Sequence, residues 1–151
     1  MRHPTRRDAL QQGSAMAALV ACGLVTAGQA RAAVDGAAFE AKTLADALKL
    51  LGGAADSKDV SITSPDIAEN GAVVPVSVTS KLPKTQEIYI LVEKNPQPLT
   101  ATFTIPEGTD AFVSTRVKMG QSTNVVAVVK ADGKLYSTTK ETKVTLGGCG
   151  G

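Results

Sequence analysis

The 151-residue chain contains one histidine, two cysteines and no tryptophan, and only 3 % of its residues are aromatic. This composition leaves few side chains for a Ser-His-Asp triad or for a zinc or copper centre built from histidine and cysteine. The formal net charge is only +2, and the length predicts a single domain.

The first 32 residues have the pattern of a cleaved secretory signal. Arg6 and Arg7 precede an apolar stretch over residues 14–27, and a small-x-small cleavage site follows at residues 30–32. The sequence "TRRDAL" around the two arginines fits a twin-arginine export signal. We therefore expect residues 1–32 to be removed during export.

Two alternatives to a cleaved signal are considered for this segment. A membrane-spanning helix needs roughly 20 apolar residues, and the uninterrupted apolar run here is shorter and contains glycine. Residues 19–22 loosely resemble a lipoprotein box, which would make Cys22 a lipid anchor. The apolar run continues past Cys22 to the later cleavage site, and this favours cleavage.

Removal of the signal changes the chemistry of the remaining chain. The residues that leave are His3, Cys22, Asp8 and the arginines Arg2, Arg6, Arg7 and Arg31. The net charge falls from +2 to about −1, so nucleic-acid binding loses its electrostatic basis. The mature chain has no histidine and one cysteine, Cys149, which excludes an intramolecular disulfide. One leftover cysteine in an exported protein indicates intermolecular pairing or a reactive thiol.

Residues 34–53 predict one amphipathic helix at the start of the mature domain. Asp35 is placed to cap its beginning, and Gly52-Gly53 to end it. We expect its apolar stripe to pack on the protein's own domain, with packing on a partner as the alternative. The stripe consists of Ala37, Ala41, Leu44, Leu48 and Leu51.

From Val60 onward the hydrophobic period changes from that of a helix to that of strands. Turn sequences recur every 8–12 residues or so, which predicts an antiparallel immunoglobulin-like β-sandwich of about seven strands within residues 33–146. Pro75 interrupts one good strand and indicates an edge or a bulge. Asp132-Gly133 predicts a hairpin turn between the last two strands. Predicted strand segments include residues 74–78, 86–94, 99–105, 111–119, 123–130 and 135–146.

The polar side chains of this domain show no catalytic pattern. The carboxylates of Asp66, Glu69, Glu107 and Asp110 have no spacing that marks an acid and base pair, and they are interpreted as solvated loop charges. The two tyrosines are interpreted as packing residues in strands. The sequence "ENG" at residues 69–71 is interpreted as a plain turn, with a role in fixing a binding loop as the alternative.

The chain ends in "VTLGGCGG", with Cys149 between two pairs of glycines, Gly147 and Gly148 before it and Gly150 and Gly151 after it. The neighbouring residues supply neither a cation nor a helix N-terminus to lower the pKa of the thiol, and the chain-end carboxylate disfavours the thiolate. Glycines give a thin, flexible arm over residues 147–151, and three residues extend by roughly 10 Å. The arm is therefore suited to carry an attached group into a narrow channel of another protein.

These features together resemble the SoxY family, the sulfur-carrier subunits of the bacterial thiosulfate-oxidation system. The shared features are the twin-arginine signal, a short helix before an immunoglobulin-like sandwich, the elements "PDIAENGAVVPVSV" and "EKNPQP", and the terminal "GGCGG". The resemblance covers nearly the whole mature chain.

The resemblance implies a periplasmic carrier and not an enzyme. Sulfur intermediates from thiosulfate would be held covalently on Cys149, and a SoxZ-like subunit would form a heterodimer with this chain. A SoxAX cytochrome would attach thiosulfate, a SoxB hydrolase would release sulfate, and a SoxCD sulfur dehydrogenase would act where it is present. Because the partners bring the metals and haems, no resident cofactor is expected. SoxZ lacks a signal and would be exported together with this chain.

Two other functions remain as alternatives. A structural periplasmic immunoglobulin-like domain could dimerise through Cys149, which predicts a covalent homodimer without sulfur adducts. A thiol enzyme such as a peroxidase would turn over substrate alone, but the mature chain lacks a histidine and a resolving cysteine.

Overall fold

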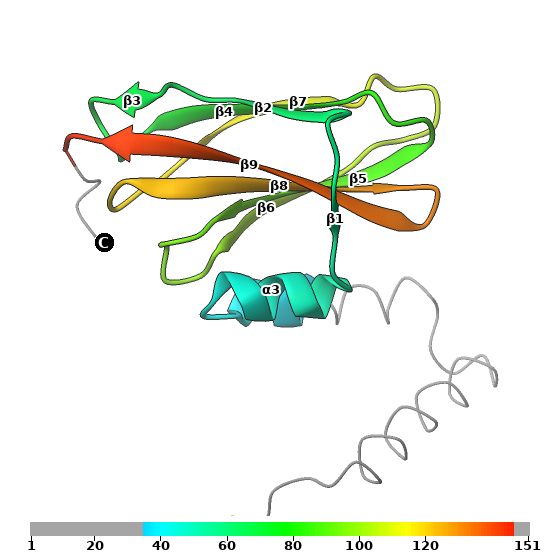
Figure 1. Ribbon diagram of the computed structural model, residues 1–151, viewed down its shortest axis with the longest axis horizontal. Coiled ribbons are helices and arrows are strands. Elements are labelled where there is room, and N and C mark those ends of the chain that lie inside the picture. The colour runs from blue at the N-terminus through cyan, green and yellow to red at the C-terminus, as the bar shows by residue number, and fades with distance from the viewer. Residues whose placement is uncertain (1–34, 147–151) are drawn as a thin grey trace, which may run out of the picture. The chain divides into compact units, whose positions relative to one another are not determined.

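The computed structural model describes residues 35–146. The chain divides into two compact units, Met1–Gly36 and Ala37–Gly151, and the described part of the second contains one complete helix and nine strands (Figure 1). The elements are α3 (Leu44–Leu51), β1 (Ala55–Asp56), β2 (Val60–Thr63), β3 (Ile67–Ala68), β4 (Val74–Ser80), β5 (Thr85–Val92), β6 (Leu99–Thr104), β7 (Phe112–Val117), β8 (Thr123–Ala131) and β9 (Lys134–Val144). Among the described residues, no helix is long and apolar enough to cross a membrane.

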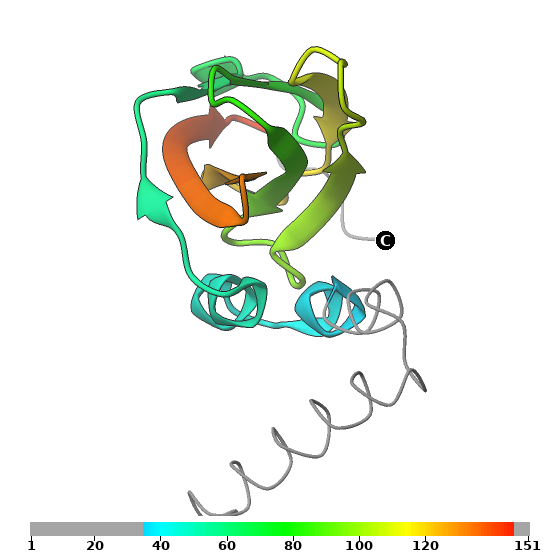
Figure 2. The same cartoon turned by 90° about the vertical axis from the view of Figure 1, so that its right-hand side faces the viewer.

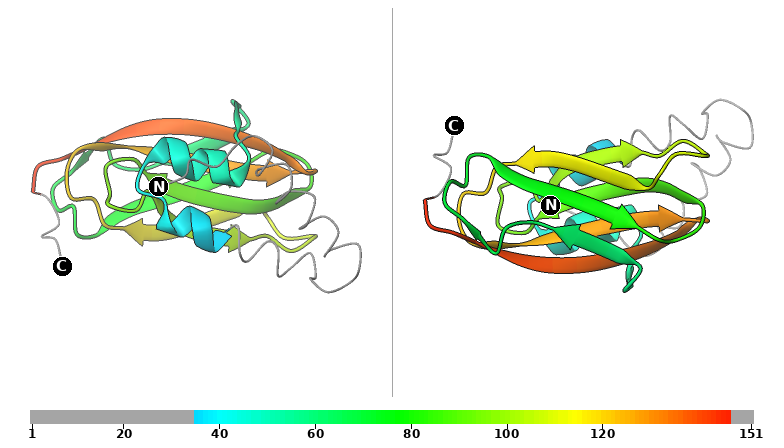
Figure 3. Two further views of the ribbon diagram at one scale, coloured as in Figure 1. Left: turned by 90° about the horizontal axis from the view of Figure 1, so that it is seen from below. Right: turned by 90° about the horizontal axis from the view of Figure 1, so that it is seen from above.

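The strands form two facing sheets, which confirms the predicted immunoglobulin-like sandwich (Figure 2). The larger sheet has the order β1-β9-β8-β5-β6, and β3 also pairs with β9. The smaller sheet has the order β2-β4-β7 and forms the layer seen from above in Figure 3. The main strands pair antiparallel, whereas β1 and β3 pair with β9 in parallel. These two-residue strands were not predicted, because two residues are too few to show a period of two.

The core lies between the sheets and is made largely of valine and isoleucine. In β4, Val74, Val76 and Val78 are buried, as their alternation predicts. The strand β5 lies between β8 and β6 and is buried on both faces, so the prediction of a central strand at residues 86–94 is confirmed. The hairpin turn is also confirmed, since Asp132 and Gly133 both have positive φ values, 49° and 76°.

The prediction of one continuous helix over residues 34–53 is wrong. Residues 37–40 are helical, the helix breaks, and α3 begins after Thr43. The Thr43 Oγ1 accepts a hydrogen bond from the Asp46 N–H at 3.1 Å, which caps a new helix within the predicted one. Asp35 has helical backbone itself and is not the cap. The predicted end is confirmed, because Gly52 adopts φ 112° and its N–H bonds the Leu48 carbonyl.

The helical residues pack on the outer face of the larger sheet, as predicted for the protein's own domain (Figure 3). Ala47 is fully buried there, and Leu44, Leu48 and Leu51 are partly buried. Ala41 is buried, as predicted. Ala37 is exposed and its neighbour Ala38 is buried instead, because the helix break shifts which residues face the sheet. The sheet side of this contact consists of Tyr89, Leu91, Leu99, Val126, Val128 and Leu135.

Pro75 lies in the central strand of the smaller sheet and not in an edge strand. The Ser80 N–H bonds the Ala111 carbonyl of the segment leading into β7, so by alternation the nitrogen of Pro75 faces the β2 side. There β2 has already ended, because its last pair is Thr63 with Ser77. The missing N–H of proline therefore removes no ladder hydrogen bond, and this explains why a central strand tolerates it.

Candidate functional site

The residues predicted to carry the function lie outside the described part of the chain. These residues are Arg6, Arg7, Gly147, Gly148, Cys149, Gly150 and Gly151. The last described residue is Leu146, three positions before Cys149. The C-terminal segment leaves the body of the protein after residues 143–146, which we call the arm root. The structure shows how the body holds these residues.

The strand β9 brings the chain to the arm root. It pairs with β8 from Ala131↔Lys134 to Thr123↔Thr142 without interruption. Beyond the last pair, the Val144 N–H donates to the Ser122 Oγ at 2.9 Å, and a side chain thus continues the ladder. The end of β9 is consequently fixed to the larger sheet up to residue 144.

The segment between β2 and β4, which contains β3 and which we call the gripping loop, forms backbone hydrogen bonds with the arm root on the side away from β8. The Lys143 N–H donates to the Asp66 carbonyl at 2.9 Å, and the Thr145 N–H donates to the Ala68 carbonyl at 3.1 Å. The Gly71 N–H then donates to the Leu146 carbonyl at 2.8 Å. Backbone bonds therefore hold the chain in place up to the last described residue.

The gripping loop is itself tied down by the turn at residues 69–71. The Asn70 Oδ1 accepts a hydrogen bond from the Ala72 N–H at 2.9 Å, the geometry of an Asx turn. The Gly71 carbonyl accepts from the Met119 N–H at 2.7 Å, which joins the loop to the chain after β7. "ENG" is a turn, as predicted, and the backbone of Gly71 bonds to the arm root; the alternative, a role in fixing a binding loop, stays a prediction.

Side-chain hydrogen bonds and an ion pair also link the start of this loop to β9. The Lys140 Nζ donates to the Ser64 carbonyl at 2.6 Å and lies 3.1 Å from the Asp66 Oδ1. The Ser64 Oγ and Thr142 Oγ1 share a buried hydrogen bond of 2.9 Å. Asp66 is exposed, as predicted for a loop charge, but its carboxylate forms an ion pair and serves to place the loop.

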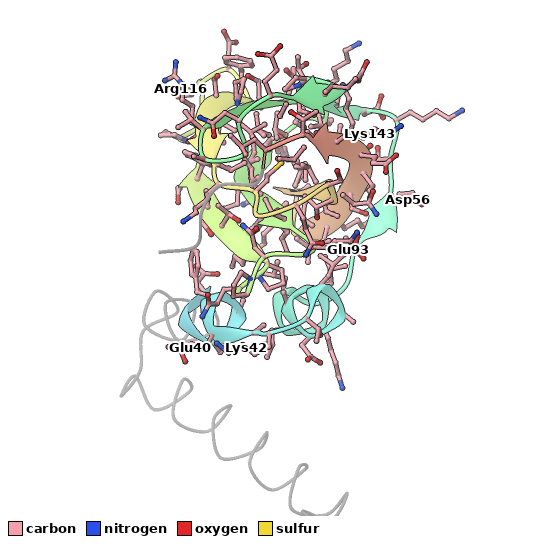
Figure 4. All side chains as sticks on the ribbon, turned by 90° about the vertical axis from the view of Figure 1, so that its left-hand side faces the viewer. Glu40, Lys42, Asp56, Glu93, Arg116 and Lys143 are labelled. Atoms are coloured by element: carbon pink, nitrogen blue, oxygen red, sulfur yellow. The ribbon has the colours of Figure 1, made fainter. Side chains whose placement is uncertain are left out.

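Three large apolar side chains are exposed at the arm root. They are Ile67, Val73 and Leu146, with 60, 54 and 65 % of their surfaces accessible. Figure 4 looks onto this end of the sandwich, where Arg116 and Lys143 lie on opposite sides. The end of the sandwich from which the C-terminal segment leaves thus exposes three apolar side chains, with the charged residues Asp66 and Glu69 in the same loop.

The other polar residues singled out in the sequence form no reaction centre within the described ranges. Asp66 and Glu69 belong to the gripping loop, whereas Glu107 and Asp110 line a hollow next to Lys81 and Lys84. The tyrosines pack in the sheets, as predicted: one is buried, and the other is partly buried against the core. Within residues 35–146, no three carboxylate, histidine or cysteine side chains gather as a metal site would require.

The pairing of β3 with β9 is the feature that sequence reasoning missed. Two residues of β3 carry no strand signal, and their partners Lys143 and Val144 lie at the far end of the chain. The only available signal was "ENG", since a turn of this type fixes a loop in one conformation.

Comparison with known proteins gives both a family and a fold. A family model described as "Sulfur oxidation protein SoxY" matches residues 47–149, which include Cys149. The structure of the sulfur carrier protein SoxY from Chlorobium limicola f thiosulfatophilum is 39 % identical and superposes with a TM-score of 0.63, covering 71 % of this chain and 96 % of that one.

A second solved structure shares the fold alone. A superoxide reductase (neelaredoxin) from Ignicoccus hospitalis is 18 % identical, with a TM-score of 0.51, and the match covers 60 % of this chain and 82 % of that one. None of the curated proteins matches the chain.

Proposed function

The chain belongs to the SoxY family of sulfur oxidation proteins, and from this membership we propose that it is a periplasmic sulfur carrier whose Cys149 holds sulfur intermediates derived from thiosulfate. The observation that carries the proposal is the arm root. The body of the protein holds the chain up to Leu146, and the family match continues to Cys149 three residues later.

This arrangement limits how far Cys149 can travel from the body. Because the Leu146 carbonyl is bonded to Gly71, only the residues after it can add to the reach of the thiol. Three residues span roughly 10 Å at most. An enzyme that acts on Cys149 must therefore bring its active site within about that distance of the arm root. The four glycines around Cys149 keep the predicted arm thin enough to enter a channel.

The proposed chemistry takes place on the sulfur of Cys149, and partner enzymes catalyse it. In the first step the thiol loses its proton and its sulfur bonds to the outer sulfur of thiosulfate, while two electrons pass to the SoxAX cytochrome. Water then cleaves the bond between that outer sulfur and the sulfonate group at the SoxB hydrolase. Sulfate leaves, and one extra sulfur stays on Cys149 for a SoxCD sulfur dehydrogenase where one is present.

The carrier role assigns the catalytic groups to the partners. The chain itself is proposed to be a substrate of these enzymes, with no resident metal or cofactor. A SoxZ-like subunit is proposed to form the heterodimer and to cross the membrane with this chain, directed by the signal around Arg6 and Arg7. This also accounts for a thiol without an activating neighbour in the sequence, because each visited active site supplies the activation.

Intact-protein mass spectrometry tests the proposal. After incubation with thiosulfate and the SoxAX cytochrome, the mature protein should gain the mass of an attached thiosulfonate group, and SoxB should convert this to one added sulfur. The variant Cys149→Ser should gain neither mass and should lose sulfur-oxidising activity. Full activity of Cys149→Ser, or activity that depends on a covalent homodimer free of sulfur adducts, would rule the carrier role out in favour of a structural domain.

A further inference from the structure

We propose that Asn70 is a site of spontaneous deamidation whose rate is controlled by the hydrogen bond from the Gly71 N–H to the Leu146 carbonyl. While this bond is closed the asparagine is protected. When the arm root opens, the asparagine is converted irreversibly to an acid. The inference concerns the body of the protein and does not depend on whether Cys149 carries sulfur.

The sequence gives Asn70 a reactive neighbour. In deamidation the main-chain nitrogen of the next residue attacks the side-chain amide carbon of asparagine. The next residue here is glycine, which has no Cβ to hinder the approach. The other asparagines are Asn95, which precedes Pro96, and Asn124, which precedes Val125. Proline has no N–H to give up and valine is branched at Cβ, so neither neighbour supports the reaction.

The reaction needs water and no oxidant or reductant. The Gly71 nitrogen loses its proton to hydroxide and bonds to the Asn70 Cγ, which closes a succinimide ring. The amide nitrogen that leaves takes up a proton from water and departs as ammonia. Water then opens the ring at either of its carbonyl carbons. One opening gives aspartate, and the other gives isoaspartate, in which the main chain passes through the Cβ of residue 70.

The turn at residues 69–71 presents the side-chain amide for this attack. Asn70 is exposed, and its Oδ1 accepts a hydrogen bond from the Ala72 N–H at 2.9 Å. A hydrogen bond to this oxygen draws electron density from the Cγ and stabilises the negative charge that develops on the oxygen. The amide carbon is therefore activated and open to water.

The arm root withholds the attacking nitrogen. The Gly71 N–H donates to the Leu146 carbonyl at 2.8 Å, and Gly71 is buried. The Met119 N–H donates to the Gly71 carbonyl at 2.7 Å and fixes the same residue from its other side. Because the proton on the nitrogen is bonded and buried, hydroxide reaches it only after a local opening. Deamidation should therefore proceed through the open state of the arm root.

The isoaspartate product cannot restore the anchor. Its longer main chain displaces the Gly71 nitrogen from the position in which it meets the Leu146 carbonyl. The last backbone bond of the arm root is then the one from the Thr145 N–H to the Ala68 carbonyl. The free segment before Cys149 gains about one residue, which is roughly 3.5 Å of reach. Aspartate, by contrast, keeps the ordinary main chain and a side-chain oxygen for the turn.

Ageing of the whole mature protein in mildly alkaline buffer, followed by peptide mapping with mass spectrometry, tests the proposal. Asn70 should deamidate at least about tenfold more slowly in the folded protein than in the same chain unfolded in urea. Asn95 and Asn124 should stay unchanged in the folded protein and serve as internal controls. In urea well below the unfolding transition, the deamidation rate of Asn70 should rise in proportion to the amide exchange rate of Gly71, because both require the same opening.

A pair of variants at Thr145 shifts the opening equilibrium. Thr145→Pro removes the N–H that donates to the Ala68 carbonyl at 3.1 Å, next to the controlling bond. Loss of one backbone hydrogen bond should speed deamidation of Asn70 about fivefold. Thr145→Ala keeps this N–H, loses the hydroxyl that donates to the Glu69 carbonyl, and should stay within about twofold of the parent protein. If Thr145→Pro does not fold, the comparison in urea decides the question with the unmodified chain.

Asn70→Asp separates the effect of the new charge from that of the altered main chain. This variant has the same carboxylate on an ordinary backbone, and Gly71 and Thr145 should keep their slow amide exchange. Aged protein that contains isoaspartate, as detected with isoaspartate methyltransferase, should show a second population in which both amides exchange at least about tenfold faster.

The contrary outcomes are equally specific. Equal deamidation rates in the folded and unfolded protein, or no deamidation in either, would refute the protected site. A rate that does not follow the exchange of Gly71, or that is the same in both Thr145 variants, would refute control by the arm root. Slow exchange at Gly71 in the isoaspartate form would refute the loss of the anchor. Adducts on Cys149 test the carrier role separately from all of these.

Discussion

The Gly71 N–H donates a hydrogen bond of 2.8 Å to the Leu146 carbonyl, and this bond joins a loop in the first half of the domain to its C-terminal end. It marks the boundary between the body of the protein and the short segment that contains the only cysteine expected in the mature chain. Any sulfur attached to Cys149 would therefore be carried on a segment that begins at a fixed anchor.

The turn that holds Gly71 should control the stability of the arm root. Asn70→Ala removes the acceptor for the Ala72 N–H, and a hydrogen bond of this kind contributes about 0.5–1.5 kcal/mol. We expect faster amide exchange at Gly71 and Thr145 with little change in global stability. Ser57→Ala is the matched control, since the Ser57 Oγ accepts a similar bond from the Asp59 N–H away from the arm root. Unchanged exchange at Gly71 in Asn70→Ala would show that the turn does not hold the root.

The distance between Leu146 and Cys149 should limit delivery to the enzymes. Deletion of Gly147 and Gly148 shortens the reach of the thiol by about 7 Å. We expect thiosulfate-derived adducts to disappear from the mass spectrum, while a small disulfide reagent in solution still labels Cys149 at the normal rate. A variant in which two serines replace the two glycines keeps the length and should retain part of the adduct yield. Normal adduct formation in the shortened protein would contradict the proposed reach.

Export should depend on the arginine pair. Replacement of both Arg6 and Arg7 by lysine keeps the charge but removes the twin-arginine signal. We expect this chain and its SoxZ-like partner to remain in the cytoplasm, as measured by immunoblots of separated periplasmic and cytoplasmic fractions. Arg2→Lys is the control, because it changes a nearby arginine outside the pair. A partner that reaches the periplasm without this chain would disprove co-export.

Substitution of a buried isoleucine should destabilise the fold, whereas substitution of an exposed isoleucine near the arm root should not. Ile90→Ala creates a cavity in the core and should lower the free energy of unfolding by about 2–5 kcal/mol. Ile67→Ala changes an exposed side chain and should alter stability by less than about 0.5 kcal/mol. Chemical denaturation of both variants measures the difference. A large loss of stability in Ile67→Ala would mean that the exposed apolar surface belongs to the fold itself.

Local patterns in the sequence were sufficient for most of the sandwich. The alternation of Val74, Val76 and Val78 marks a half-buried strand whatever its partner is. Asp132-Gly133 predicts its turn because few other residues adopt positive φ at both central positions, and Gly52 ends its helix for the same reason. The terminal "GGCGG" and the absence of histidine after residue 32 are the sequence features on which the proposed carrier role rests, and the described residues do not test them.

The tertiary structure decided the features that depend on distant neighbours. Pro75 is compatible with a central strand only because β2 ends beside Ser77, and β3 exists only because β9 offers it a free edge. The break before Thr43 lets the two helical segments lie on one sheet face. Thr43, with Asp46 three residues later, is a local signal for a helix start, but only packing on the sheet shows that the chain uses it. Short-range propensity determines strands and turns, whereas backbone hydrogen bonds between segments far apart in sequence determine which strands meet and where the arm is anchored.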